Sequence, residues 1–566
     1  MSTRIERARA YYKKKGFAKT CKKTVRVLKR IAMEKTVWKS LWASEKELQQ
    51  WSQESFAYQP KLSILIPMYK TPLPFFKELM DCFQGQIYSN WELCLADGSG
   101  EDTEAYEYVK ELQKTDDRIK YKRLECNGGI SENTNAALDM ATGDFIVLCD
   151  HDDLVTKDAF YHVVKALNED KEIDTLYTDE DKVDMDGKEH FDPAFKPDFN
   201  IDFFRGGNYI CHMFVTRLEI AKQVRFKKEY DGAQDFDFIF RCCEASKRVH
   251  HIPRLLYHWR CHMNSTAGNP ESKLYAYEAG VKAIQAHLDR VGIQATAEMT
   301  PFFGYYFVNY HQVDMPKVSL ISTEKLSDKV YNSIDYPNME IVLIAGEYTP
   351  ENINKAVKER ATGEILFFVD PRVQELKEDC FEKLLAPHQR EDLASTFAKV
   401  SNMEGTLYSV GMVTGVRGFF GRSFPAVEEE NNGYAMRLLI PQNLSASDLT
   451  CAMIKRADFE AVGGMEEQMN YICSAVDLYL KMGQAGKLHF FETRAQAMID
   501  AYVDEDAEDE WADLGGISES EKAQFCEKWS EITSGVDRNY NPNLTQVYGG
   551  YVMKGWMELR AERKKH

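Results

Sequence analysis

The chain has 566 residues, 44% of them hydrophobic, and a formal net charge of −18. Its length predicts more than one globular domain, and its acidic body argues against nucleic acid as a partner. It contains no run of 18 apolar residues, no signal-peptide core and no CxxC pair among its 13 cysteines, so we expect no membrane span, no export by a signal peptide, and a reducing cytoplasm.

A basic helical arm is predicted at residues 1–55. Residues 1–35 contain 13 Lys or Arg and only two Glu, and apolar residues recur at three- and four-residue steps from Phe17 to Leu28. Such a helix suits the anionic inner face of a membrane. The same apolar stripe would equally allow the helix to pack on the body of the protein, and the sequence leaves both interpretations open.

Four apolar runs alternate with helical segments in the domain that we predict at 56–315. The runs lie at 62–66, 91–96, 119–124 and 145–149, and each leads into a polar or glycine-containing loop. This alternation predicts parallel βαβ units, in which the loops after the strands gather at one edge of the sheet. We therefore expect Pro67, Asp97, Gly128 and Asp150 to surround one crevice.

The fourth run ends in a cluster of acids. Asp150, Asp152 and Asp153 directly follow the apolar residues 145–149. Carboxylates this close repel one another unless something positive joins them, and a divalent cation bound to a phosphate is one solution. The alternative interpretation is a solvated acidic loop after a core strand.

Three of these motifs, at 63–69, 95–99 and 141–153, resemble in order and spacing the nucleotide-sugar half of family 2 glycosyltransferases. The resemblance covers about 62–268, and the motifs at 177–181 and 256–267 are similar to bacterial members that build surface polysaccharides, rhamnosyltransferases among them. It implies the GT-A fold, a Rossmann-like α/β domain with a mostly parallel sheet. It also implies an inverting enzyme that uses a nucleoside-diphosphate sugar.

The resemblance implies roles for residues at matching positions. Asp97 would recognise the base of the donor nucleotide, although its place before Gly98 also suits a simple turn. Other donor contacts are implied for Pro67, Tyr69, Asp150 and Arg260, and acceptor contacts for Asp179 and Glu180.

A metal site is implied as well. Asp150 and Asp152 match the DxD pair, and His262 is a possible third ligand. Mn²⁺ or Mg²⁺ is expected, because oxygen ligands and a diphosphate suit hard cations.

Asp235 matches the general base of the family, in a motif where Gln234 replaces the usual Glu. A carboxylate there would take the proton of the acceptor hydroxyl as that oxygen attacks, which fits inversion in one step. The alternative is that Asp235 caps the following helix. Asp237 does not share its helix face and is predicted to be structural.

The chain then repeats itself without the acids. Segments 318–322, 336–346 and 361–373 match 62–66, 88–98 and 141–153, but Ala345, Arg372 and Ala475 stand where Asp97, Asp152 and Asp235 stood. The repeat also lacks the stretch that holds the third strand. We therefore predict a degenerate GT-A-like domain at 316–545, followed by a tail at 546–566. The segment 537–544 resembles a C-terminal signature of two-domain relatives, and the sequence assigns it no role.

The sequence thus predicts a metal-dependent inverting glycosyltransferase that moves a sugar from a UDP or dTDP donor to a growing bacterial cell-surface polysaccharide. The acceptor would be a saccharide or lipid-linked saccharide, and the enzyme would lie in the cytoplasm, peripheral to the inner face of the plasma membrane. Two alternatives are a bifunctional polymerase with two active domains and a non-catalytic carbohydrate-binding or assembly subunit.

Overall fold

The computed structural model describes Thr24, Val37 and residues 40–100, 103–261, 274–323, 326–501, 514 and 516–562. Apart from Thr24, the predicted basic segment 1–35 lies outside the described residues, and so does His262. None of the described helices combines the length and apolar character that a membrane crossing requires.

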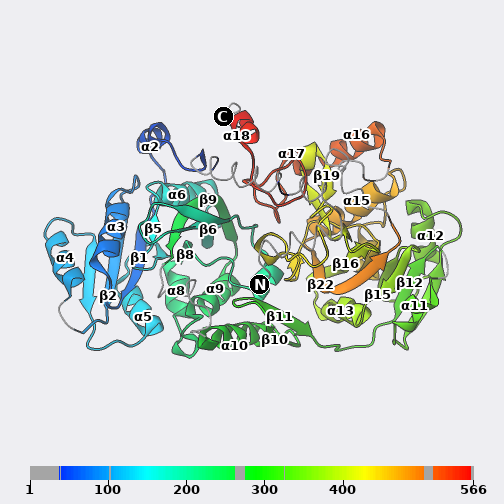
Figure 1. Ribbon diagram of the computed structural model, residues 1–566, viewed down its shortest axis with the longest axis horizontal. Helices are drawn as coiled ribbons and strands as arrows, with labels where there is room; N and C mark the ends of the chain where they lie inside the picture. Colours follow the sequence, from blue (N-terminus) through cyan, green and yellow to red (C-terminus); the bar gives the residue numbers. More distant parts are fainter. Residues whose placement is uncertain are drawn as a thin grey trace.

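Strand and helix alternate in the first part of the N-terminal domain (Figure 1). Four strands pair in parallel in the order β3-β2-β1-β4. Every residue of β1 and β2 is buried, which explains why these strands are apolar without alternation. The elements are β1 (Leu62–Met68), α3 (Leu73–Gln84), β2 (Trp91–Asp97), α4 (Glu104–Leu112), β3 (Ile119–Arg123), α5 (Ile130–Met140) and β4 (Phe145–Leu148).

The same sheet continues as β4-β8-β6-β9-β5, with β7 beside β6. These pairs are antiparallel except β6 with β9. The predicted α/β fold of the GT-A type is confirmed, with the parallel strands concentrated in its first part. The elements are β5 (Leu154–Val155), α6 (Ala159–Glu169), β6 (Thr175–Val183), β7 (His190–Ala194), α7 (Ile201–Gly206), β8 (Phe214–Arg217), α8 (Leu218–Val224), α9 (Gln234–Ala245) and β9 (Val249–Arg260).

The register of the parallel strands brings their ends together. Leu65 of β1 pairs with Leu148 of β4, and Met68 pairs with Asp97 of β2. The loops after these strands therefore leave the sheet at one edge, where a ligand crevice is expected in open α/β sheets.

A second sheet follows the helix α10 (Leu274–Arg290) and the hairpin of β10 (Ala295–Met299) and β11 (Tyr306–Tyr310). Its order, β13-β12-β14-β21-β16-β22-β15, repeats β2-β1-β4-β8-β6-β9-β5 of the first sheet. Among the described residues no strand corresponds to β3, as the shorter repeat predicted. The strands are β12 (Val318–Ser322), β13 (Met339–Leu343), β14 (Ile365–Val369), β15 (Val373–Leu376), β16 (Leu393–Asn402), β17 (Leu407–Ser409), β18 (Met412–Thr414), β19 (Phe420–Arg422), β20 (Gln442–Asn443), β21 (Cys451–Lys455) and β22 (Leu488–Ile499).

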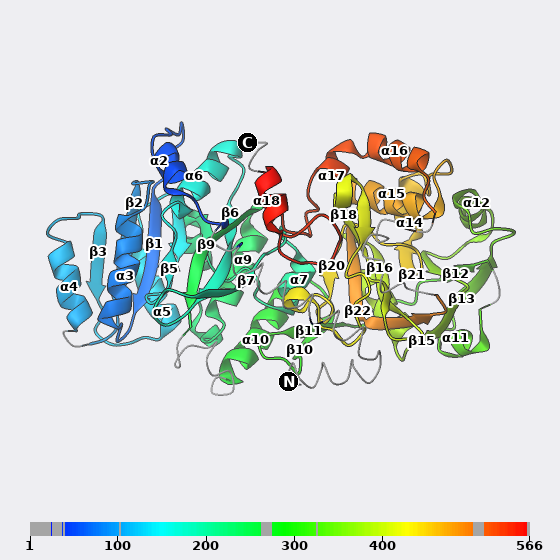
Figure 2. The ribbon, with the colours of Figure 1, turned by 45° about the horizontal axis from the view of Figure 1, so that its top comes forward.

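Helices cover this second sheet as they cover the first, and further helices lie at the two ends of the described chain (Figures 1 and 2). The helix α2 (Glu45–Trp51) precedes the first sheet. The others are α11 (Asp328–Asn332), α12 (Pro350–Arg360), α13 (Cys380–Leu385), α14 (Arg456–Ala461), α15 (Tyr471–Gln484), α16 (Glu519–Lys528), α17 (Ser530–Ser534) and α18 (Trp556–Glu562).

A buried glutamate joins three segments at the base of the first sheet. Glu92 accepts hydrogen bonds from Ser63 Oγ (2.8 Å) and the amide of Thr142 (2.7 Å). Burial alone would raise the pKa of Glu92, but Lys61 and Lys120 lie beside it and the pKa falls to about 2. The carboxylate thus stays charged and ties β1, β2 and the turn before β4 together.

The second domain repeats this arrangement almost atom for atom. Glu340 accepts from Ser319 Oγ (2.6 Å) and the amide of Thr362 (2.6 Å), and Lys317 pairs with it. Its pKa is also about 2, because these contacts outweigh the effect of burial. A shared network of hydrogen bonds and ion pairs at equivalent positions supports the duplication more strongly than apolar patterns do.

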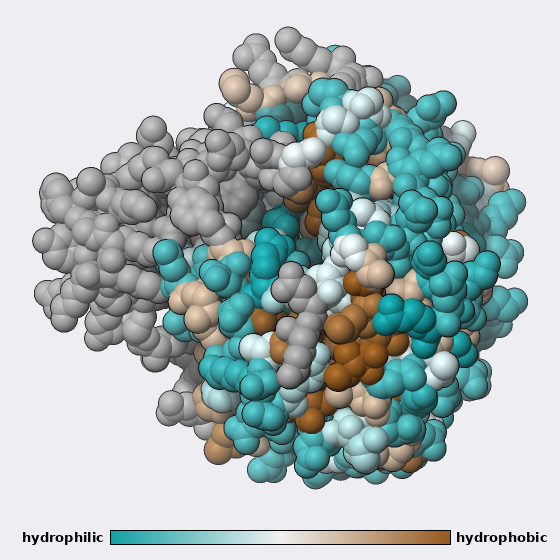
Figure 3. Space-filling model, turned by 90° about the vertical axis from the view of Figure 1, so that its right-hand side faces the viewer, coloured by the Kyte–Doolittle hydropathy of each residue, from teal (hydrophilic) through white to brown (hydrophobic). Residues whose placement is uncertain are grey.

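Loss of the third strand exposes an edge of the second domain. Leu93 and Leu95 of β2 are fully buried, but the equivalent Ile341 and Leu343 of β13 are 49% and 36% exposed. In the first domain β3 pairs with β2, and Val109 of α4 belongs to the same core cluster as Leu93 and Leu95. Figure 3 shows apolar residues gathered on the end of the molecule that carries the second domain.

The two domains are held together by a buried ion pair. Asp202 of α7 accepts from Arg390 Nη1 (2.7 Å) and Asn443 Nδ2 (2.7 Å), both from the second domain. Burial opposes the charge on Asp202, but Arg390 and Arg205 hold the pKa of this carboxyl below its usual range.

The C-terminal segment 537–543, which we call the strap, also bridges the domains. Figures 1 and 2 show the chain that leads to α18 passing between them. Asp537 accepts from the Thr414 amide (2.9 Å) and Ser445 Oγ (2.6 Å) of the second domain. Asn541 Nδ2 donates to Asp179 Oδ2 (2.8 Å) of the first domain. The signature that the sequence left without a role is therefore an interdomain clasp.

The strap yields a stability prediction. Asn541→Ala removes donors from the fully buried Asp179, so we expect the free energy of unfolding to fall by about 1–3 kcal/mol, since a buried acceptor loses its partner. Urea titration of the full chain measures it. Asn332→Ala, at an exposed position, serves as the matched control. Equal stability of Asn541→Ala and Asn332→Ala would contradict the assigned role.

Candidate active site

A cavity of about 660 Å³ lies beyond the strand ends of the first domain. Pro67 of β1 and Asp150 after β4 line it on one side, and Asp235 at the start of α9 lines it on another. The predicted metal ligand Asp150 and the predicted base Asp235 therefore meet in one space, although 85 positions separate them in the chain.

Asp97 and Tyr69 lie on neighbouring loops. Asp97 is buried at the end of β2, where it accepts from the Ser99 amide (2.9 Å) and from Tyr121 Oη (2.9 Å). Tyr69 follows β1 and is 44% exposed, and the next amide, of Lys70, donates to Ser99 Oγ (2.9 Å). The loops after β1 and β2 are thus joined, and a nucleotide role for both residues stays a prediction.

Asp150 forms a candidate metal group with two residues that the sequence did not single out as ligands. Possible ligand atoms of Asp150, Asp153 and His212 all lie within 4.8 Å of one another. Nε2 of His212 lies 3.6 Å from Oδ2 of Asp150. Asp152, the second acid of the predicted pair, is outside this group, although Arg260 Nε donates to its carbonyl oxygen (2.7 Å).

Strand register explains the place of His212. Leu148 of β4 pairs with Phe214 of the antiparallel strand β8, so the residues two positions beyond and before them meet at the tip. Those residues are Asp150 and His212. The signal in the sequence was a His just before a strand, but only the antiparallel pairing of β4 and β8 gives that His a partner.

The charges of this group suit a divalent cation. Burial, together with Asp150 and Asp152, raises the pKa of Asp153 well above its usual range. Tyr257 Oη donates to Asp153 and its ring stacks on His212, with centroids 4.8 Å apart. Nδ1 of His212 is buried and has no hydrogen-bond partner among the described residues. A cation would relieve this carboxylate repulsion, and a His and two carboxylates are suitable ligands.

Arg260 has a structural task in this structure. It is 1% exposed, and besides the contact with Asp152 it donates to Met185 O (2.8 Å) and Glu78 Oε2 (2.5 Å). Its amide donates to Asp153 Oδ1 (2.8 Å). The resemblance implied a phosphate contact, but the guanidinium here holds the acidic loop in position.

Asp235 has the properties of a base. Asn208 Nδ2 donates to its Oδ2 (2.8 Å), and no side chain caps α9. Burial raises the pKa of Asp235, and Asp150 adds to this effect while His212 opposes it. A carboxylate with a raised pKa accepts a proton more readily than an ordinary one. Asp237 is fully buried and paired with Arg241, which supports its predicted structural role.

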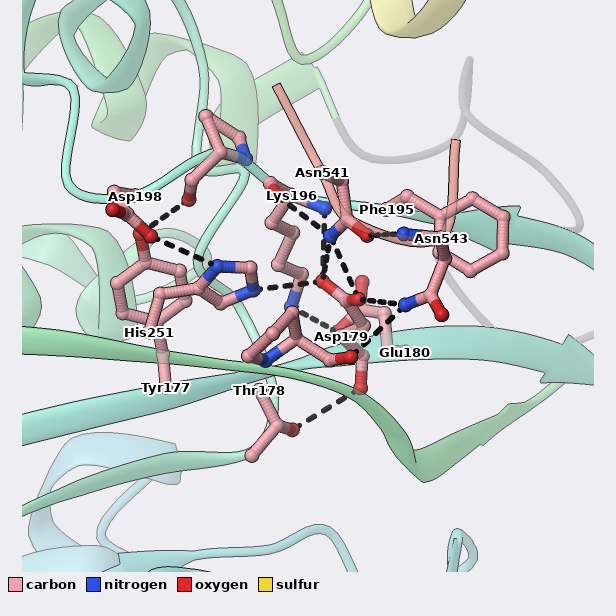
Figure 4. Close-up of polar contacts among 12 residues, drawn as sticks. Tyr177, Thr178, Asp179, Glu180, Phe195, Lys196, Asp198, His251, Asn541 and Asn543 are labelled. Carbon is pink, nitrogen blue, oxygen red and sulfur yellow. Dashed lines mark hydrogen bonds and ion pairs between the residues drawn. The ribbon is translucent and has the colours of Figure 1, made fainter. Parts of the chain in front are cut away.

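Asp179 and Glu180, predicted on the acceptor side, differ in position (Figure 4). Asp179 is fully buried and accepts from His251 Nε2 (2.8 Å), the Lys196 amide (2.9 Å) and the strap residue Asn541. Glu180 lines the cavity and accepts from Lys196 Nζ (3.2 Å). The amide of His212 also donates to Glu180 (3.0 Å), so the strap is linked by hydrogen bonds to the candidate metal group.

The second domain has an ion pair at the equivalent strand tip. Arg372 Nε and Nη2 donate to Asp370 at 3.0 and 2.8 Å, and this contact raises the pKa of the guanidinium. Arg372 therefore neutralises Asp370 through a direct salt bridge, where a cation would otherwise be needed. Ala475 is buried within α15 and offers no base.

Comparisons with known proteins agree with this geometry. The family model for glycosyl transferase family 2 matches residues 63–225. An uncharacterized protein, y4gI, of Sinorhizobium fredii is 31% identical over 75% of this chain and 51% of its own length. The O-antigen biosynthesis protein RfbC of Myxococcus xanthus is 28% identical over 76% of this chain and 36% of its own length. The chain thus spans about half or less of these two relatives.

A solved structure of Staphylococcus aureus TarS in complex with UDP-GlcNAc is 19% identical and covers 40% of this chain and 66% of that chain, with a TM-score of 0.34. This score is too low to bear on the fold, which rests on the strand order above. The matched segment 63–225 contains β1 to β4, the acidic loop and His212. The segment 63–225 therefore matches the family 2 glycosyl transferases.

Proposed function

We propose that this protein is a metal-dependent inverting glycosyltransferase that transfers a sugar from a nucleoside diphosphate to a bacterial surface polysaccharide. The observation that carries the proposal is the cavity in which Asp150, with its candidate metal group, faces the same space as Asp235. Such a reaction must bind a donor diphosphate and an acceptor hydroxyl close together. Asp150 would serve the diphosphate through a cation, and Asp235 would serve the hydroxyl as its base.

The residues divide the work as follows. Asp150, Asp153 and His212 would hold Mn²⁺ or Mg²⁺, with Asp152 as the further candidate from the DxD pattern. When bound, such a cation neutralises the charge of the departing nucleoside diphosphate. Asp235 accepts the proton of the acceptor hydroxyl while its oxygen bonds to the anomeric carbon and the donor C–O bond breaks. Attack on the face opposite the leaving group inverts the anomeric carbon.

The identity of the substrates belongs to the same proposal. A UDP or dTDP sugar is the proposed donor, and Asp97 and Tyr69 are the proposed contacts of its base. A saccharide, free or lipid-linked, is the proposed acceptor, which the O-antigen relative supports. The 13 basic residues within 1–35 support peripheral contact with the inner membrane face.

The two-active-domain alternative is less well supported. A second active site would need acids at three positions that hold Ala345, Arg372 and Ala475 instead. The remaining acid there, Asp370, is already paired with Arg372. A purely binding role leaves the raised pKa of Asp235 and the acid cluster of the first domain without a purpose.

The base assignment predicts a loss of turnover without loss of the donor site. Asp235→Asn keeps the size of the side chain but removes its basicity, so sugar transfer should fall by about 10²–10⁴-fold. Release of nucleoside diphosphate from a panel of UDP and dTDP sugars measures this. Nucleotide affinity with Mn²⁺, determined in parallel, should remain. Turnover at the wild-type rate would remove Asp235 from the mechanism.

The metal assignment predicts a difference between the two domains. Asp150→Ala should abolish the rise in melting temperature that UDP or dTDP gives together with Mn²⁺. Asp370→Ala, the equivalent change in the second domain, should leave that rise unchanged, because Arg372 already neutralises this acid. An effect of Asp370→Ala as large as that of Asp150→Ala, in folded protein, would show that the second domain also binds donor.

A further inference from the structure

The second domain reaches into the cavity of the first. Tyr434, Ala435, Arg437 and Ile440 line the same space as Asp235. We call residues 434–440 the second-domain wall. They belong to the degenerate repeat, so their presence in this cavity does not follow from the glycosyltransferase motifs of the first domain.

Hydrogen bonds hold the start of the wall in place. Tyr434 Oη accepts from the amide of Phe195 (2.8 Å), which directly follows β7, and donates to the carbonyl of Pro193 (2.8 Å) within β7. The strap and the Asp202 ion pair hold the same two domains together. The wall is therefore a fixed part of the cavity lining.

The other end of the wall lies next to the proposed base. A Cβ added to Gly206 would lie 1.8 Å from Cγ2 of Ile440, so the two backbones approach closely here. Two positions further on, Asn208 donates its hydrogen bond to Asp235. A molecule that rests on the wall would thus be near the carboxylate that takes the acceptor proton.

The lining of this end of the cavity suits a sugar. Its two lysines are paired with acids: Lys182 with Asp192 at 2.5 Å, and Lys196 with Glu180 at 3.2 Å. Aromatic rings with a polar edge are suited to a ligand that has both apolar C–H faces and hydroxyls. The cavity is lined by five such rings, those of Tyr277, Tyr305, Tyr306, Trp259 and Tyr434, and by the apolar ring of Phe303.

The remaining cation, Arg437, is 1% exposed. Its guanidinium lies 4.7 Å from the ring centre of Phe203 and 5.0 Å from that of Tyr551, and its Nη1 donates to Gln442 Oε1 (2.5 Å). It is thus enclosed by aromatic rings and an amide. The accessible part of this end therefore offers no unpaired positive charge among the described residues, which favours an uncharged sugar.

We propose that the second domain, having lost its own reaction, binds the acceptor: the second-domain wall and the facing aromatic side chains form a subsite for a neutral saccharide. This inference rests on the proposed transferase function of the cavity. It gives the degenerate repeat a task in the reaction of the first domain, and it places acceptor recognition on residues outside the family 2 motifs.

Ala435 is the position at which to test this subsite. Its side chain is exposed, it lines the cavity, and no hydrogen bond of the wall depends on it. Ala435→Arg would place a long cation in the subsite while keeping Tyr434 and Arg437. Met403→Arg, at a 55% exposed site of the same domain outside the cavity, is the matched control.

The experiment measures glycoside affinity of the full chain by saturation-transfer NMR. The probes are p-nitrophenyl glycosides of glucose, galactose and rhamnose, with the glucuronide as the charged analogue. We expect at least one neutral glycoside to bind the wild type and Met403→Arg alike, and Ala435→Arg to weaken it by about tenfold or more. The glucuronide should bind more weakly than the neutral glycoside.

Three results would overturn the inference: no neutral glycoside binds the wild type, Ala435→Arg binds it with unchanged affinity, or the glucuronide is preferred. Affinity for UDP and dTDP with Mn²⁺ is measured on the same samples. Its absence in the wild type would count against the proposed function, while the glycoside result would still decide the subsite. A cooperative thermal transition of Ala435→Arg shows that the variant is folded.

Discussion

The repulsion between carboxylates at the tip of β4 is the constraint on which the rest of the site depends. Asp150 and Asp153 lie close together in a partly buried position, and burial keeps Asp153 from ionising readily. Arg260 fixes the loop with two hydrogen bonds, from its amide to Asp153 and from its guanidinium to the carbonyl oxygen of Asp152. It does not neutralise the carboxylates. A bound cation would stabilise both charges, and on this we base the proposal that the strand tip binds the donor.

The second domain solves the same problem differently. At its equivalent tip Arg372 replaces an acid and pairs with Asp370, so the charge is satisfied within the chain. The hydrogen bonds of Glu340, which tie β12, β13 and the turn before β14 together, are retained. The second domain thus retains the frame of the sheet, while Ala345, Arg372 and Ala475 stand where the first domain has acids, and residues of the segment 434–440 line the neighbouring cavity.

Much of this arrangement could be predicted from the sequence, because parallel βαβ units place strand ends at one edge. The comparison of the two repeats located the missing strand. The rule for parallel strands brought Pro67 and Asp150 to one cavity, but Asp97 and Gly128, which we expected there too, are not among the residues that line it. It could not find His212, whose role depends on the antiparallel register of β4 and β8. The sequence also did not reveal that Arg260 is bound within the first domain by Glu78. The contacts of the strap could not be predicted either, since Asn541 and Asp179 are 362 positions apart.

We expect a single donor site, in the first domain, to serve the whole chain. Isothermal titration calorimetry of the full chain tests this expectation directly, with UDP and with dTDP, each in the presence of Mn²⁺ and then of Mg²⁺. The account predicts a stoichiometry of one nucleotide per chain for at least one of these pairs, and no binding without metal. Two sites per chain, or binding that is indifferent to metal, would contradict it.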